Sequence, residues 1–215
     1  MESFEFKETS LSKDKFITIG IQHKRMKAEF KSYKDHVGFL VTQCPLLDTV
    51  VDFWCLVYDH ESSTIVTLDC TSEDEPLLNR IPANKSAIRI GRFSIRRTKN
   101  TTVIGDTKET EVCLVNEDNE RIIKVFEVQS WRQGLPTPSS GQVLLKLIEM
   151  VEHWKDTASD GPITVVCMDG AKCCGLFCAL FNTIQKLRYE DNVDIYQTVK
   201  QLQVRRPEFF SSIVS

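Results

Sequence analysis

The stretch from residue 163 to residue 178 constrains this chain more than any other part of its sequence. It reads Ile-Thr-Val-Val-Cys-Met-Asp-Gly-Ala-Lys-Cys-Cys-Gly-Leu-Phe-Cys, an apolar run that ends at Cys167 and continues into a short loop. A helix is predicted to open near Gly175. Backbone N–H groups at the start of a helix form a cradle for an anion, so the pattern predicts a thiol above an oxyanion-binding loop. The cation that should close the cradle is missing, because Cys173 stands six residues after Cys167.

The composition is that of an ordinary globular chain. A length of 215 residues, 41% of them hydrophobic, suits one or two domains with a sizeable core. The formal net charge is -3 and the basic residues are scattered, so clusters such as Arg96-Arg97 are interpreted as solvated faces rather than nucleic-acid surfaces. No apolar run is long enough to span a bilayer, and the charged N-terminus does not resemble a signal peptide.

The chain contains eight cysteines. No pair has C-x-x-C spacing, and the neighbours Cys173 and Cys174 are poorly placed to chelate one metal, so we predict no metal and no cofactor. The remaining cysteines outside the loop are interpreted as buried free thiols in a reduced compartment, and they are Cys44, Cys55, Cys70, Cys113 and Cys178.

The pattern of apolar residues predicts a mixed sheet covered by helices, which is an α/β (α+β mixed) fold. Residues 1–14 are polar and are expected to be frayed. Strands are predicted over 15–21, 38–42, 63–68 and 163–166, with an antiparallel run over 87–130 and a loop over 70–86. Helices are predicted over 46–60, 142–155, 175–188 and 193–206, the last ended by Pro207.

Five blocks, taken in order, resemble the protein tyrosine phosphatase family. Residues 39–46 are similar to the family's strand and turn that read T-Q-G-P, and residues 48–54 are similar to its E-T-x-x-D-F-W helix. Residues 125–136 are similar to the segment with the mobile W-P-D loop, and residues 167–175 are similar to the signature H-C-x5-R-[ST]-G. Residues 193–200, with Arg206-Pro207, are similar to the helix that follows the signature. The residues Cys-Met-Asp-Gly from Cys167, with Phe177-Cys-Ala179, most resemble the membrane-distal second domains (D2-type) of receptor-type members.

The resemblance implies a highly twisted mixed sheet flanked by helices. It implies one incomplete phosphatase-like domain over residues 31–215, after a divergent N-terminal segment over residues 1–30. The family's first helices, its K-N-R-Y segment and its last helix have no counterpart, so we expect a domain truncated at both ends.

The resemblance also assigns roles to single residues. Cys167 takes the nucleophile position, Cys173 the position of the phosphate-gripping Arg, and Gln133 that of the general acid. The phosphate loop then consists of Met168, Asp169, Gly170, Ala171, Lys172, Cys174 and Gly175, and the mobile loop contains Trp131, Arg132, Gly134 and Pro136.

These substitutions remove chemistry that phosphotyrosine hydrolysis needs. A thiol cannot replace the planar, charged fork of a guanidinium, and Lys172 is only a point charge. Gln133 has no proton to donate at neutral pH. Asp169 brings a carboxylate to the rim of a cradle for a dianion, where a like-charge contact at ~5 Å and an effective dielectric of about 20 costs about 3 kcal/mol. Alternatively, Asp169 is a turn residue that binds its own loop N–H groups.

Three hypotheses follow for the function. The first is a catalytically impaired phosphatase-like domain that works by protein contact, on a tandem active domain or a phosphotyrosine signalling partner, in the cytoplasm or at the cytoplasmic side of a receptor. The second is an active or weakly active phosphatase that uses Cys167. The third is a redox-sensing thiol loop built from Cys167, Cys173 and Cys174.

Overall fold

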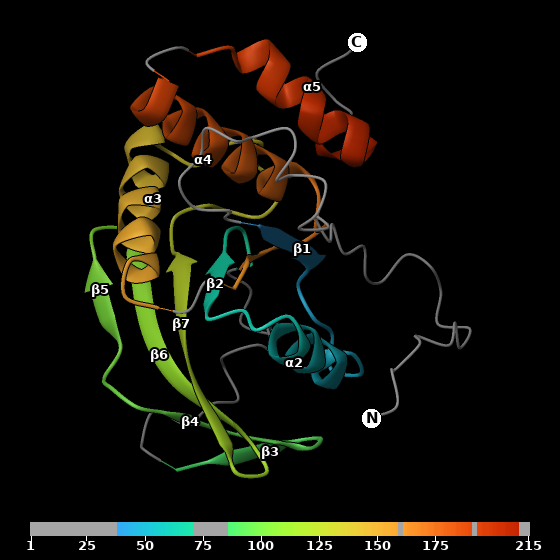
Figure 1. The fold of residues 1–215 in the computed structure, drawn as a ribbon, viewed down its shortest axis with the longest axis vertical. Coiled ribbons are helices and arrows are strands. Elements are labelled where there is room, and N and C mark those ends of the chain that lie inside the picture. The colour runs from blue at the N-terminus through green and yellow to red at the C-terminus, as the bar shows by residue number, and fades with distance from the viewer. Residues whose placement is uncertain (1–37, 71–85, 159–160, 191–192, 211–215) are drawn as a thin grey trace.

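The structure is a computed structural model, and it describes residues 38–70, 86–158, 161–190 and 193–210. The predictions for residues 1–30, including the strand over 15–21, lie outside the described residues, as does nearly all of the loop predicted over 70–86. The predicted fold class is confirmed: the described residues form one mixed sheet with helices packed on it (Figure 1).

The sheet has eight strands in the order β1-β8-β2-β7-β6-β4-β3, with β5 paired to β6. Strand β8 runs parallel between β1 and β2, and β7 runs parallel to β2 on the other side. The remaining pairs are antiparallel, as predicted for the middle of the chain. The strands are β1 Phe39–Gln43, β2 Thr64–Thr67, β3 Ile88–Ile90, β4 Phe93–Arg97, β5 Thr102–Ile104, β6 Thr107–Asn116, β7 Asn119–Val128 and β8 Ile163–Cys167.

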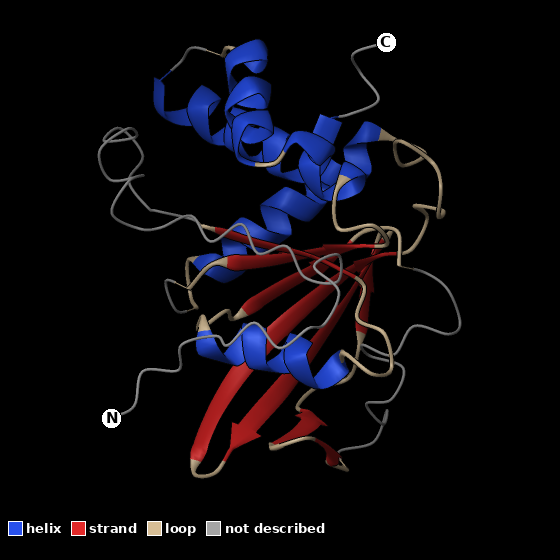
Figure 2. Ribbon diagram, turned by 90° about the vertical axis from the view of Figure 1, so that its right-hand side faces the viewer, coloured by secondary structure: helices blue, strands red, loops and turns tan. Residues whose placement is uncertain are grey.

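The helices cover both faces of this sheet (Figure 2). Helix α2 (Val50–Asp59) lies on one face, whereas α3 (Gly141–Lys155) and α4 (Lys172–Glu190) pack on the other and α5 (Ile195–Arg205) packs on α4. The 3-10 helix η1 (Pro207–Phe210) follows α5. Strand β8 contributes to both cores, since alternate side chains of a strand point to opposite faces: Val165 packs with α3 and α4, and Val166 with α2.

Two helices begin three or more residues from the predicted start, whereas α3 and α5 begin within two residues of theirs. Helix α2 begins at Val50 rather than at residue 46, because Thr49 Oγ1 accepts the Leu46 N–H at 2.9 Å and closes a turn there. Helix α4 begins at Lys172 rather than near Gly175, because the Asp169 side chain accepts hydrogen bonds from the backbone ahead of it. Cys173 and Cys174 therefore lie in the first turn of α4.

The prediction of free thiols is wrong for Cys44 and Cys70, which form a disulfide. The parallel strands β1 and β2 both flank β8, so the chain leaves their carboxyl ends at the same edge of the sheet and brings the two Cα atoms to 6.5 Å. The reduced compartment was predicted because these cysteines were interpreted as free thiols, and the disulfide contradicts that interpretation. Cys113 and Cys178 are free and buried, and Cys55 is free and half-buried.

A helix crosses a bilayer only if it is long and predominantly apolar. Of the helices in the described ranges, none is both long and apolar enough to cross a membrane.

Candidate functional site

The loop predicted to bind an oxyanion lies at the carboxyl end of β8, between the ends of β1 and β2. Both neighbouring segments hold it through the backbone. The Cys44 N–H donates to the Cys167 carbonyl at 2.8 Å, and the Met168 N–H donates to Asp69 Oδ1 at 2.8 Å. The close packing explains Gly170, which has φ +62° and whose added Cβ would lie 2.5 Å from the Gln43 nitrogen.

Cys167 is the last residue of β8 and its side chain is fully buried. Its Sγ donates to Asp169 Oδ1 at 3.3 Å. The sulfur that the resemblance makes the former nucleophile thus has a carboxylate beside it.

The carboxylate of Asp169 binds the loop's own backbone. Asp169 Oδ1 accepts the N–H of Ala171 at 2.8 Å and that of Lys172 at 3.1 Å. Both readings of this residue from the sequence, the turn and the carboxylate at the rim, therefore describe its position. The negative group that the N–H groups of the cradle bind in this structure is therefore the side chain of Asp169.

Most other N–H groups of the loop also have partners within the protein. Gly170 N–H donates to the Cys167 carbonyl, Gly175 N–H to the Ala171 carbonyl, and Cys174 N–H to the Cys167 sulfur. Of the eight residues from Met168 to Gly175, six therefore donate to a protein acceptor, and these are Met168, Gly170, Ala171, Lys172, Cys174 and Gly175. An incoming anion would have to displace these bonds, because an N–H group serves one strong acceptor at a time.

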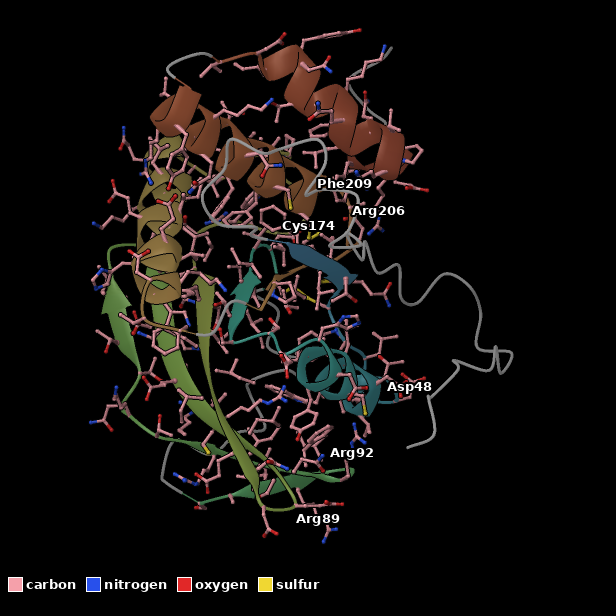
Figure 3. The ribbon with its side chains drawn as sticks, viewed as in Figure 1. Asp48, Arg89, Arg92, Cys174, Arg206 and Phe209 are labelled. Atoms are coloured by element: carbon pink, nitrogen blue, oxygen red, sulfur yellow. A yellow bond between two sulfur atoms is a disulfide. The ribbon has the colours of Figure 1, made fainter. Side chains whose placement is uncertain are left out.

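The position that would carry the phosphate-gripping Arg is buried and uncharged. Cys173 is 4% exposed, and its Sγ donates to Asp69 Oδ2 at 3.5 Å. Lys172 is exposed, as expected for a side chain that points away from the turn. Figure 3 places Arg89 and Arg92 at the far end of the molecule from Cys174, while Arg206 lies near it. Arg206 is buried, stacks on the Phe209 ring at 5.4 Å and pairs with Glu208 at 3.7 Å.

The three thiols of the loop form a coupled group. Hydrogen bonds from the thiols of Cys173 and Cys174 lower the pKa of Cys167, and they outweigh the opposing effect of its burial. The same contact with Cys167, together with burial, raises the pKa of Cys173. Burial is the main cause that raises the pKa of Cys174. The sequence predicted a lowered pKa from helix N–H groups alone, and the structure adds the two thiols as the larger causes.

Asp69 is a site residue that the sequence reading missed. It follows the apolar run of β2, is 6% exposed, and binds both Met168 and Cys173. Burial raises the pKa of Asp69; the hydrogen bond from Met168 opposes this, and the negative charge of Cys167 adds to it. The sequence could have indicated this role, because Asp69 comes directly after a buried strand, at the edge of the sheet where parallel strands end.

The segment predicted as the mobile loop is a turn anchored by its tryptophan. Trp131 is fully buried, and its Nε1 donates to the Leu135 carbonyl at 3.0 Å. The Leu135 N–H in turn donates to the Arg132 carbonyl at 3.2 Å, and Gly134 takes a φ of +83°. The polar side chains of this turn are exposed, as is Pro136. Gln133, at the general-acid position, therefore faces solvent.

The residues that the structure describes contain no cluster of metal-ligating side chains. Within them, no three His, Cys, Asp or Glu side chains gather closely enough to hold an ion.

The order of strands, the loop after β8 and the helix that follows it define a protein tyrosine phosphatase domain. The sequence model of the family described as "Protein-tyrosine phosphatase" matches residues 22–214, and the chain belongs to this family.

Individual relatives are receptor-type members. The chain is 28% identical over 184 residues to human receptor-type tyrosine-protein phosphatase alpha, and this match covers 84% of this chain and 23% of that protein. It is 32% identical over 180 residues to the chicken receptor-type tyrosine-protein phosphatase S, covering 81% of this chain and 12% of that protein. It is 27% identical over 188 residues to human receptor-type tyrosine-protein phosphatase epsilon, and this match covers 84% of this chain and 27% of that protein. The chain thus spans roughly a quarter or less of these curated relatives.

Proposed function

We propose that this phosphatase-like domain is catalytically impaired and acts by protein contact, as a D2-type domain would on a tandem phosphatase domain or a phosphotyrosine signalling partner. The proposal places it on the cytoplasmic side of a receptor. The observation that carries it is the Asp169 carboxylate, which accepts the Ala171 and Lys172 N–H groups where a phosphoryl group would need them.

Three further features support the loss of catalysis. Cys167 is fully buried, so an attacking sulfur would not meet a substrate. Cys173 offers no positive charge, and Gln133 offers no acid. Transition-state charge stabilisation and acid catalysis are each worth roughly 10²–10⁵-fold in rate, so their joint loss leaves little turnover.

Contact as the mode of action is supported by what the chain retains. The scaffold around the site is intact, with well-filled cores on both faces of the sheet. Large apolar side chains are exposed near the loop and on the terminal helices, among them Leu46, Leu47, Leu187, Ile195, Tyr196 and Val204. A domain that keeps its core and loses its reacting groups is suited to binding another protein.

Hydrolysis of p-nitrophenyl phosphate tests the catalytic half of the proposal. We expect the wild-type chain to show no more turnover than its Cys167→Ser variant, which removes the sulfur and keeps its size. A triple variant, Cys173→Arg with Gln133→Asp and Asp169→Ala, serves as the positive arm for the scaffold. Turnover by the wild type that depends on Cys167 would instead support an active phosphatase.

A binding measurement tests the other half. The chain is immobilised and titrated with a phosphotyrosine peptide, its unphosphorylated form, and an active phosphatase domain from a receptor-type relative. We expect binding to the protein domain and no preference for the phosphorylated peptide. A preference for the phosphorylated peptide over its unphosphorylated form would contradict the occupied cradle.

A further inference from the structure

We infer that the Cys44–Cys70 disulfide is a reducible clamp on the loop, and that its reduction exposes Cys167. This inference rests on the proposed function, because it concerns the regulation of the same loop. It is tested by chemical labelling, whose outcome is separate from turnover and from partner binding.

The two cysteines hold the loop from opposite sides. On one side, the Cys44 N–H donates to the Cys167 carbonyl at 2.8 Å. On the other side, Cys70 follows Asp69, whose carboxylate binds the Met168 N–H at 2.8 Å and the Cys173 thiol at 3.5 Å. The disulfide joins these two sides directly.

These links form a closed ring around the start of the loop. It runs from Cys44 through the disulfide to Cys70, along the chain to Asp69, across a hydrogen bond to Met168, and back through Cys167 to Cys44. The disulfide is the one link outside the peptide backbone that does not open by thermal fluctuation. The others are hydrogen bonds, each with a net contribution of about 1 kcal/mol.

The chemistry of opening the clamp is thiol–disulfide exchange with a dithiol reductant. A reductant thiolate attacks the sulfur of Cys44, the more exposed of the pair at 7% against 2% for Cys70, and the Cys70 thiolate leaves. The second reductant thiolate attacks the mixed disulfide and releases the Cys44 thiolate. The reductant supplies two electrons and two protons, becomes a cyclic disulfide, and leaves Cys44 and Cys70 as thiols.

The consequence falls on Asp69 and then on Cys167. With the disulfide intact, Cys44 and Asp69 stay close together, and their hydrogen bonds to the loop re-form after each opening. Once Cys70 is free of Cys44, Asp69 can move away from Met168 and Cys173, so the loop opens more often, and opening is how a fully buried sulfur meets a reagent.

Pulsed alkylation of the native chain with N-ethylmaleimide, followed by mass spectrometry, tests the clamp. We expect Cys167 to label at least about tenfold faster after treatment with dithiothreitol, since labelling of a buried group follows its opening equilibrium. The Cys70→Ser variant should show the fast rate without reductant. The matched variant Cys113→Ser, which removes a buried free thiol from β6, should keep the slow rate and the response to reductant.

Cys178 provides the internal reference, because it is buried in α4 and lies outside the ring. A clearly larger acceleration at Cys167 than at Cys178 supports the clamp, because Cys178 reports the loss of stability of the fold as a whole. Equal rates at Cys167 in the oxidised and reduced chain overturn it. Equal acceleration at both cysteines overturns it too, because that result is general loosening. The inference also fails if a non-reducing digest contains no linked peptide of Cys44 and Cys70.

Discussion

Asp69 contributes to the loop from 99 positions away in the sequence. Its carboxylate lies in a nearly closed environment, and burial raises its pKa above the ordinary value of 3.8. Asp169 lies within the loop and binds the next turn instead. Two acidic residues thus satisfy a loop whose geometry suits an anion, and the carboxylate of Asp169 repels a phosphate.

The raised pKa of Asp69 predicts a pH dependence of stability. The folded chain holds a proton on this group that the unfolded chain releases above pH 3.8. Stability should therefore fall as pH rises from about 3.8 through the folded-state pKa, since the unfolded state then binds fewer protons. The Asp69→Asn variant keeps an acceptor for Met168 and removes the titration.

Urea unfolding of both chains between pH 4 and pH 7 measures the effect, with the pH range chosen around the ordinary carboxyl pKa of about 4. The expected result is a stability difference that moves in favour of the variant as pH rises. A difference that stays constant with pH, or that moves toward the wild type, would contradict the assigned protonation.

At the scale of elements, most of the strand and helix pattern was predictable. The short apolar run of β8 and the helical spacing of α3 are carried by local sequence, and both elements begin within one residue of the predicted start. The start of α4 was missed, because it depends on where one side chain, Asp169, places its oxygen. The disulfide and the role of Asp69 were not predicted either, because both depend on which strands become neighbours in the sheet. The spacing of apolar residues along a single sequence does not reveal which strands pair.

The N-terminal turn of α4 packs directly on η1, and this contact predicts the effect of a small substitution. A Cβ added at Gly175 would lie 2.8 Å from Phe209 Cβ and 3.1 Å from the Phe209 carbonyl oxygen. Gly175→Ala should destabilise the chain by roughly 1–3 kcal/mol, the usual cost of overpacking. Chemical denaturation gives the value.

Gly141→Ala is the matched control at the start of α3. No atom lies within 4 Å of its added Cβ, so the change should be neutral or stabilise by up to about 1 kcal/mol. Equal effects at the two glycines would show that the Phe209 contact does not limit the packing of α4.

At the scale of the whole molecule, the sheet separates two cores that share β8. The disulfide joins the strands that flank β8 across a separation of 26 residues. A crosslink of this span restricts the unfolded chain by an amount equivalent to about 3 kcal/mol. It therefore stabilises the fold as a whole besides its local contact with the loop.

Reduction should lower the free energy of unfolding by about 3 kcal/mol through this loss of restriction. Guanidinium unfolding with and without dithiothreitol measures the change, and the Cys70→Ser variant should be insensitive to the reductant. An unchanged midpoint in the wild type would mean that the pair does not constrain the unfolded state.

The central claim is that two N–H groups a phosphoryl group would need, those of Ala171 and Lys172, are already occupied by Asp169. The most direct measurement is a tungstate titration of the wild type and the Asp169→Ala variant, followed by NMR of the Ala171 and Lys172 amide resonances. We predict no saturable shift at these amides in the wild type and a saturable shift in the variant, where the N–H groups lose their internal acceptor. Saturable binding of tungstate at the same amides in the wild type would contradict the claim.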